Sequence, residues 1–151
     1  MEITIRKASY EDLAAILSLV KELAAYEKAP EEVWASIQDY QEGFEAGDFE
    51  ALVVEVHEKI VGTALYYISW STWKGRMMYL EDFIVKEIYR RFGVGQKLFE
   101  AFLTEAKTTK CRLVKWQVLD WNTDAIKFYE KNGAIIEKDW WNGKIIFQNP
   151  C

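Results

Sequence analysis

The sequence predicts one α/β domain, residues 1–151, built on a single mixed sheet with flanking helices. In some segments apolar residues alternate with polar ones, and in others they recur at helical spacing. These segments follow one another in the order β-α-α-β-β-β-α-β-α-β-β, and no linker, repeat or low-complexity segment interrupts them. With 151 residues, the chain can bury about two-thirds of its unfolded surface, which allows a substantial core.

The first part of the chain predicts one strand and two helices. Glu2 to Lys7 alternates, as a strand does. Ser9 is a candidate N-cap, and Asp12 stands in the capping-box position. The helix that follows is indicated by apolar residues at helical spacing: Leu13, Ile16, Leu17, Val20, Leu23 and Ala24. Pro30 ends this helix or begins the next, which is predicted over Glu31 to Glu45.

The middle of the chain predicts three consecutive strands. Phe49 to Val56 and Ile60 to Ile68 are joined by a tight turn at His57-Glu58-Lys59. Gly75 lies in the next turn, and Met77 to Val85 forms a third, long strand. No helical pattern separates the three strands.

The C-terminal part predicts a helix, a strand and a second helix. The first helix spans Gly93 to Lys107, and the strand spans Leu113 to Leu119. Asn122 is placed to cap a helix over Thr123 to Asn132, with Gly133 at its C-terminal end.

The last predicted elements are two short strands. They are Ile135-Ile136 and Lys144 to Phe147, and Asn142-Gly143 between them is a strong hairpin signal.

Composition limits the function. The chain has 24 acidic and 19 basic residues and a net charge of −5. This argues against sequence-independent binding of nucleic acid, which needs a basic face, and it suits a small cationic ligand. No apolar run is long enough for a membrane span, and the N-terminus resembles a strand and not a signal peptide. We therefore expect a cytoplasmic protein without a membrane partner. Cys111 and Cys151 have no metal-binding spacing, so no metal is expected.

A glycine-rich turn at Arg90 to Gln96 separates a predicted strand from a predicted helix. Such a turn lets backbone N–H groups converge at the positive end of a helix dipole, which suits a phosphate. The two arginines add attraction for the same anion. The alternative is a basic strand–helix turn without a ligand.

Glu81 and Asp82 are adjacent in an otherwise apolar strand. Alternation predicts that their side chains point to opposite faces of the sheet. Charged groups are costly there unless they are paired or face water, so we expect a wet cleft. Either residue alone could also be an ordinary rim residue. His57 is the only histidine and lies in a turn, so carboxylates, tyrosine or water must carry any proton transfer.

A second pattern lies downstream, at Asn122, Ala125, Phe128, Tyr129, Gly133 and Ala134. Alone, Phe128 and Tyr129 fit the core face of an amphipathic helix. Together, this segment and the Gln/Arg-x-x-Gly-x-Gly/Ala match at Arg90 to Gly95 make the chain resemble the GNAT superfamily of acyl-CoA-dependent N-acetyltransferases over essentially its full length. The resemblance implies a GNAT-like fold, in which a mostly antiparallel central sheet contains a splayed strand.

Within that superfamily the chain is similar to the diamine (spermidine/spermine) N1-acetyltransferases and their thialysine-acetylating relatives. The segments that carry this similarity are Ile5-Arg6, Lys21 to Glu27, Val61 to Tyr67, Tyr79 to Val85 and Trp121-Asn122. Two features depart from the pattern. The 57–59 hairpin is shorter than in the animal enzymes, and Ser71-Thr72 precedes Trp73 where those enzymes carry an acidic residue.

The resemblance implies transfer of an acetyl group from acetyl-CoA to a primary amine of a polyamine or diamine. Tyr129 matches the general acid, and Glu81 is the candidate to accept the proton of the ammonium group through water. The residues implied in cofactor binding are Phe83, Ile84, Val85, Arg90, Arg91, Phe92, Gly93, Val94, Gly95, Gln96, Asn122 and Ala125. The residues implied in amine binding are Tyr26, Glu27, Glu81, Asp82, Trp73 and Trp141. A homodimer is expected.

Two other functions remain open at this point. One is acetylation of thialysine, lysine-like amino acids or another small amine. The other is a non-catalytic acetyl-CoA-binding module, against which Tyr129, Glu81 and the complete phosphate signature argue.

Overall fold

The structure, a computed structural model, describes residues 1–147. The chain divides into two compact units, one over Met1–Trp116 and one from Gln117 onward. The elements of the first unit are β1 (Ile3–Lys7), η1 (Tyr10–Asp12), α1 (Leu13–Tyr26), η2 (Pro30–Glu32), α2 (Ile37–Glu45), β2 (Glu50–Val56), β3 (Lys59–Ser71), β4 (Gly75–Val85), η3 (Glu87–Phe92), α3 (Val94–Thr108) and β5 (Leu113–Lys115).

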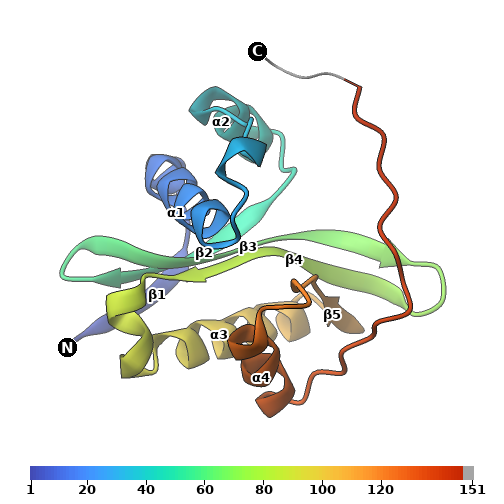
Figure 1. Ribbon diagram of the computed structural model, residues 1–151. Helices are drawn as coiled ribbons and strands as arrows, with labels where there is room; N and C mark the ends of the chain where they lie inside the picture. The colour runs from blue at the N-terminus through green and yellow to red at the C-terminus, as the bar shows by residue number, and fades with distance from the viewer. Residues whose placement is uncertain (148–151) are drawn as a thin grey trace. The chain divides into compact units, whose positions relative to one another are not determined.

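The five strands form one sheet in the order β1-β2-β3-β4-β5. The first three neighbouring pairs are antiparallel, and β4 pairs with β5 in parallel. Helices α1 and α2 lie on one face of the sheet and α3 lies on the other (Figure 1). The predicted mixed, mostly antiparallel sheet with flanking helices is therefore confirmed.

The pairing of β4 with β5 is short. It runs only from Met77 opposite Leu113 to Tyr79 opposite Lys115, whereas β4 continues to Val85. Beyond Tyr79 the two strands are no longer paired, which is the expected splay. The strand predicted over Leu113 to Leu119 is therefore too long.

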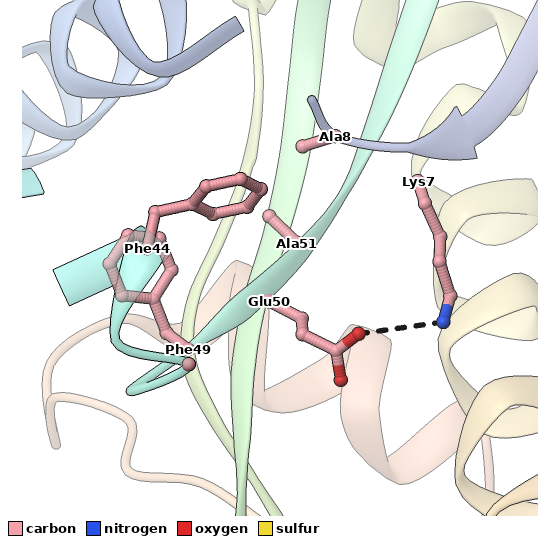
Figure 2. Close-up of a pocket in the computed structure, with 7 residues that line it drawn as sticks. Lys7, Ala8, Phe44, Phe49, Glu50 and Ala51 are labelled. Atoms are coloured by element: carbon pink, nitrogen blue, oxygen red, sulfur yellow. Dashed lines mark hydrogen bonds and ion pairs between the residues drawn. The ribbon is translucent and has the colours of Figure 1, made fainter. Parts of the chain in front are cut away.

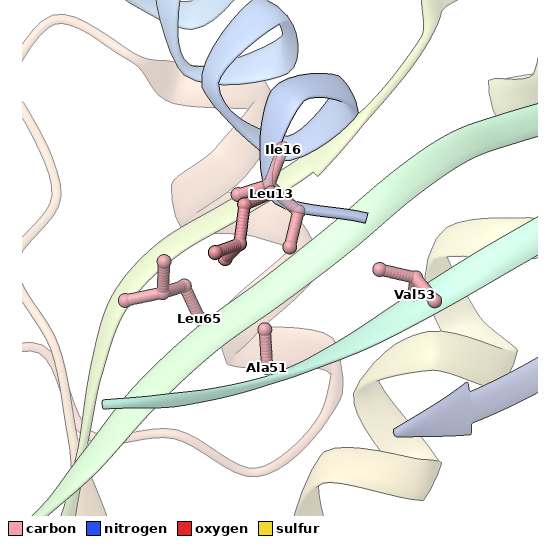
Figure 3. Packing of buried hydrophobic residues seen from close by; sticks show 5 residues of the cluster. All are labelled: Leu13, Ile16, Ala51, Val53 and Leu65. Atoms are coloured by element: carbon pink, nitrogen blue, oxygen red, sulfur yellow. The ribbon is translucent and has the colours of Figure 1, made fainter. Parts of the chain in front are cut away.

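The core has a layer on each face of the sheet. On the α1 and α2 face, a cluster forms from Leu13, Ile16, Ala51, Val53 and Leu65 (Figure 3). Tyr40 and Phe44 of α2 pack against this cluster. On the α3 face, the Tyr66 ring lies 5.7 Å from that of Phe102. Both layers are apolar, so burial of their side chains is the main stabilising term.

The start of α1 is fastened to the sheet by Arg6. Its guanidinium donates to both carboxylate oxygens of Asp12, at 2.7 and 3.0 Å, and its Nε donates to Glu55 at 2.8 Å. The Asp12 carboxylate also accepts the Ser9 backbone N–H at 2.8 Å, as the predicted capping position requires. These hydrogen bonds, those from Arg6 first, hold the pKa of Asp12 below its usual value.

Asp12→Asn is expected to lower the free energy of unfolding by about 1–3 kcal/mol at pH 7, because the variant loses hydrogen bonds from a charged partner. Since the folded-state pKa of Asp12 is depressed, its contribution is present above the unfolded pKa and is lost as the pH falls through the folded pKa. Urea unfolding at pH 7 and at low pH measures this. Asp39→Asn is the matched control, because Asp39 accepts the Ser36 N–H at 2.8 Å in an exposed capping box. Equal losses in the two variants would exclude a special contribution from Arg6.

The second helix is shorter than predicted. Residues 33–36 separate the turn η2 from α2, so one helix over Glu31 to Glu45 is wrong. Ser36 explains the break: its hydroxyl accepts the Asp39 N–H at 3.2 Å and sets a new helix start.

The second unit contains α4 (Thr123–Lys131), capped as predicted by Asn122, whose side-chain oxygen accepts the Ala125 N–H at 3.3 Å. Gly133 has a φ of +88° just beyond the helix. The predicted hairpin around Asn142-Gly143 is wrong, because residues 134–147 form no strand. The side chains of Ile135, Ile145 and Phe147 are exposed, and an isolated two-stranded hairpin is at best marginally stable in water.

Candidate acyl-transfer site

The predicted phosphate turn opens α3. After η3, Gly93 adopts the left-handed conformation, with φ 73° and ψ 12°, and α3 starts at Val94. The first hydrogen bond of the helix runs from the Lys97 N–H to the Gly93 carbonyl, at 3.1 Å. The N–H groups of Val94 and Gly95 therefore precede the helix ladder, in the geometry that suits an anion. A glycine is required at 93 because this backbone conformation strains other residues.

Arg90 fastens this turn to two neighbouring elements. Its Nε donates to the Val85 carbonyl at 2.9 Å, and its guanidinium carbon lies 5.8 Å from the centre of the Tyr26 ring. Arg91 and Phe92 are exposed, whereas Val94 is buried. The Gln96 side chain donates to Glu100 at 3.1 Å. Arg90 therefore joins the turn to the end of α1.

The end of β4 offers backbone groups beside this turn. Phe83, Ile84 and Val85 pair on one edge with β3, and they lie beyond the part of β4 that pairs with β5. The Phe83 ring contacts that of Phe99 edge-on, with centroids 5.7 Å apart, which holds this part of β4 against α3. An extended ligand chain could hydrogen-bond to the second edge of β4 in the manner of an added strand.

Glu81 and Asp82 lie on the same face of the sheet, so the prediction of opposite faces is wrong. Leu80 pairs with Tyr66 and Asp82 pairs with Leu65, which leaves Glu81 as an extra residue in a β-bulge. Leu65 belongs to the cluster beneath α1 and α2, which places Asp82 on that face. The Tyr67 hydroxyl, on the same face by alternation from Leu65, donates to Glu81 at 3.0 Å.

Three carboxylates gather on this face. Burial first, and then the negative charges of Glu81 and Glu27, raise the pKa of Asp82 to about 6. Burial also raises the pKa of Glu27, which follows directly after α1. Among the ion pairs between described residues, none involves Glu27, Glu81 or Asp82. We call these three residues the carboxylate cluster. It can attract a cation.

Two tyrosines that the sequence pattern did not indicate lie beside the carboxylate cluster. Tyr67 donates to Glu81, and burial and the carboxylates of Asp82 and Glu81 raise the pKa of Tyr40 to about 12. Alternation along β3 from the apolar Leu65 could have placed Tyr67. No local signal in α2 could have placed Tyr40, because its position depends on how α2 packs on the sheet.

Two other residues of the first unit that were predicted to bind the amine have exposed side chains. Tyr26, the last residue of α1, is partly exposed and contacts Arg90. Trp73 lies in the turn between β3 and β4 and is 83% exposed. From Gly75 to Glu81, β4 extends over about 20 Å at the usual rise per residue. The role predicted for Trp73 stays a prediction.

Four predicted residues belong to the second unit. Asn122 and Ala125 form the cap of α4, and Tyr129 is buried, with its ring 5.6 Å from that of Phe128. Trp141 lies in the segment without regular structure and is exposed. The roles predicted for these four residues stay predictions.

A separate pocket of about 320 Å³ lies between the end of β1, the end of α2 and the start of β2 (Figure 2). Its lining residues are Lys7, Ala8, Phe44, Gly47, Phe49, Glu50 and Ala51. Lys7 forms ion pairs with Glu50 and with Glu105, so its charge is already compensated. The pocket contains none of the predicted site residues, and we therefore do not assign the acyl-transfer site to it.

Residues 1–147 contain neither a metal-binding group of side chains nor a membrane-spanning helix. No group of three or more histidine, cysteine or acidic side chains there is arranged to hold a metal ion. None of the helices in that range combines the length and the apolar character needed to cross a bilayer.

Comparison with known proteins gives matches over most of the chain. The acetyltransferase (GNAT) family matches residues 13–134. A thialysine N-epsilon-acetyltransferase from Bos taurus is 38% identical, over 93% of this chain and 89% of that protein. A spermidine/spermine N(1)-acetyltransferase-like protein 1 from Homo sapiens is 34% identical, over 87% of this chain and 20% of that protein.

A solved structure supports the same fold. An aminoglycoside acetyltransferase from an uncultured soil metagenomic sample, in complex with trehalose, superimposes with a TM-score of 0.80. The alignment covers 97% of both chains at 19% identity, which bears on the fold alone. With the family match over both units and the identity to the bovine relative, the chain belongs to the acetyltransferase (GNAT) family and is an N-acetyltransferase.

Proposed function

We propose that this enzyme transfers an acetyl group from acetyl-CoA to a primary amine of a small cationic substrate, a polyamine or diamine. The observation that carries the proposal is the carboxylate cluster of Glu27, Glu81 and Asp82. Three carboxylates on one face of the sheet, without a basic partner in an ion pair among the described residues, suit a ligand with more than one ammonium group.

The fit to acetyl-CoA rests on two features of the first unit. The N–H groups that precede the α3 ladder suit the pyrophosphate, and the edge of β4 over Phe83 to Val85 suits the pantetheine chain. Asn122 and Ala125 are proposed to contact the other end of the cofactor. When bound, acetyl-CoA supplies the thioester whose acetyl group is transferred.

Two residues are proposed to move protons. An alkyl ammonium with a pKa near ~10 must lose a proton before its nitrogen can attack. Glu81, exposed and held by Tyr67, is proposed to accept that proton through water. Tyr129 is proposed to donate a proton or a hydrogen bond to the departing thiolate. Neither group requires a histidine.

A second candidate substrate class is an amino acid with a side-chain amine, such as thialysine. The bovine relative carries thialysine in its name. An amino acid also carries a carboxylate, which needs a basic partner near the cluster. The pKa of Asp82 is raised by burial first and then by the charges of Glu81 and Glu27, with no basic group among its causes, which favours a ligand without a negative group.

The test is CoA release from acetyl-CoA with spermidine, spermine, putrescine, thialysine and lysine as acceptors. Higher kcat/KM for the polyamines or the diamine supports the proposal. Higher kcat/KM for thialysine or lysine contradicts it and favours the second class. Acetyl-CoA binding without CoA release for any amine would indicate a binding module.

Ionic strength gives an independent prediction. The kcat/KM for spermidine is expected to fall about tenfold between low salt and 0.5 M salt, because screening weakens attraction between the exposed part of the cluster and a polycation. The KM for acetyl-CoA, measured in the same series, reports on salt effects at the phosphate turn. If kcat/KM for spermidine did not respond to salt, acidic steering would be excluded.

Three further proposals concern the protein as a whole. We propose that the two units form one catalytic domain, residues 1–151, since the family match runs through both units. We also propose a homodimer and a cytoplasmic location. Sedimentation of the full chain tests the dimer, and localisation of a tagged chain tests the compartment.

A further inference from the structure

The geometry points to Tyr67 as a positioning residue that holds the Glu81 carboxylate in place for proton acceptance. This inference rests on the proposed function, because it assigns a task to a residue that supports Glu81. It begins from the bulge in β4, where Glu81 is opposite no residue of β3 in the register. The backbone at this position leaves the side chain without the support that a regular cross-strand pair gives.

The Glu81 side chain is exposed, and several rotamers are open to it. A glutamate side chain has three rotatable bonds, and fixing it in one conformation opposes its conformational entropy. Within residues 1–147, the Tyr67 hydroxyl donates a hydrogen bond to this carboxylate at 3.0 Å. That bond selects one conformation on the α1 and α2 face.

Tyr67 is itself held rigidly. Its ring stacks on that of Tyr79, with centroids 5.4 Å apart and planes 25° apart, and the two residues are partners in the β3–β4 register. Burial first, and then the Glu81 carboxylate, raise the pKa of Tyr67 to about 12. The phenol therefore stays protonated at neutral pH and remains a donor.

Position matters for proton transfer because a base must lie within hydrogen-bond reach of the proton, directly or through one water. A carboxylate that samples several conformations satisfies this only part of the time. Tyr67 does not need to touch the amine to affect the rate, because it acts through Glu81. A purely structural role would instead reduce stability and would not depend on Glu81.

The chain offers a matched pair of variants. Tyr67→Phe keeps the stacked ring and removes the donor to Glu81. Tyr79→Phe removes the other hydroxyl of the same stack and keeps that donor. With spermidine and acetyl-CoA, Tyr67→Phe is expected to lower kcat about tenfold, with the KM for acetyl-CoA and the melting temperature unchanged. Tyr79→Phe is expected to stay within about twofold of wild type.

The dependence on Glu81 is measured with Glu81→Gln and the double variant. If Tyr67 acts through Glu81, adding Tyr67→Phe to Glu81→Gln causes little further loss, so the two effects are not additive. Wild-type kcat in Tyr67→Phe, or full additivity, overturns the positioning role while the proposed function stands. If Glu81→Gln retains wild-type kcat, Glu81 is not the base, and the positioning role fails with it. If the wild-type protein acetylates no amine of the panel, both proposals fail.

Discussion

Tyr129→Phe is expected to lower kcat by about 10²–10⁴-fold, the usual range for a general acid. The thiolate of CoA leaves poorly without a proton or a hydrogen bond, and phenylalanine supplies neither. The KM for acetyl-CoA should change little, because the ring and its edge-on contact with Phe128 are kept. Steady-state kinetics with varied acetyl-CoA at saturating spermidine separates the two parameters.

Two controls make this result specific. Tyr10→Phe removes an exposed phenol from η1 and should leave kcat unchanged. Thermal unfolding shows whether loss of the hydroxyl disturbs the fold, since Tyr129 is buried. Turnover at the wild-type rate in Tyr129→Phe would remove this residue from the mechanism.

Asp82→Asn is expected to act on affinity and stability in opposite directions. Loss of a partly buried charge opposite an ammonium group should raise the KM for spermidine about 10–100-fold, with less effect on kcat. The same change removes a carboxylate that burial and the charges of Glu81 and Glu27 destabilise. The variant should therefore bind the amine less tightly and unfold at a higher temperature.

The pH dependence of the stability difference between wild type and Asp82→Asn follows from the raised pKa of Asp82. The pKa of Asp82 rises from 3.8 to about 6 on folding, so the folded state binds its proton more tightly than the unfolded state. No penalty exists well below the unfolded pKa of 3.8, where both states are protonated. The penalty grows as the pH rises from there towards 6 and is complete above 6, at about 2–3 kcal/mol. The stabilisation in Asp82→Asn should accordingly be complete at pH 7.5 and small at pH 4.

Amine affinity provides the complementary readout. In the wild-type protein, the KM for spermidine should increase as the pH falls through about 6, because Asp82 becomes neutral. Asp82→Asn should lose that part of the pH dependence. Asp48→Asn, at an exposed aspartate, controls for the change of one unit in net charge. A KM at Asp82→Asn equal to that of Asp48→Asn would show that Asp82 does not contact the amine.

Several elements of both units could be predicted because their signals are local. Alternation predicted β1 to β4 closely, Asn122 capped α4 as expected, and the glycine turn at Arg90 to Gln96 opened α3. In each case the deciding interaction lies within a few residues of the chain. The segment from Ser9 to Asp12 likewise formed the predicted cap, although its tie to Arg6 and Glu55 crosses the sheet.

The predictions were wrong where contacts between residues distant in sequence, or a local irregularity, determine the structure. A bulge adds one residue to β4, and strict alternation therefore gave the wrong face for Glu81. The Ser36 hydroxyl accepts the Asp39 backbone N–H and starts a new helix, so the single predicted helix is interrupted. Tyr40 reaches the cluster only because α2 packs above the sheet, which no local pattern encodes. The hairpin signal at Asn142-Gly143 was overruled because turn chemistry alone cannot hold two strands together.

Most residues of a sheet both pair with a neighbouring strand and present a side chain for function. The bulge in β4 separates these two tasks at Glu81. Glu81 has no partner in the β3–β4 register, so the ladder passes from Leu80 to Asp82 without it. Evolution can therefore exchange the side chain at 81, and with it the chemistry, at little cost to the sheet. Asp82, one residue later, is part of the ladder and of the charge cluster at once. A change there alters stability and amine recognition together, whereas a change at position 81 alters the proposed proton acceptor and leaves the ladder in place.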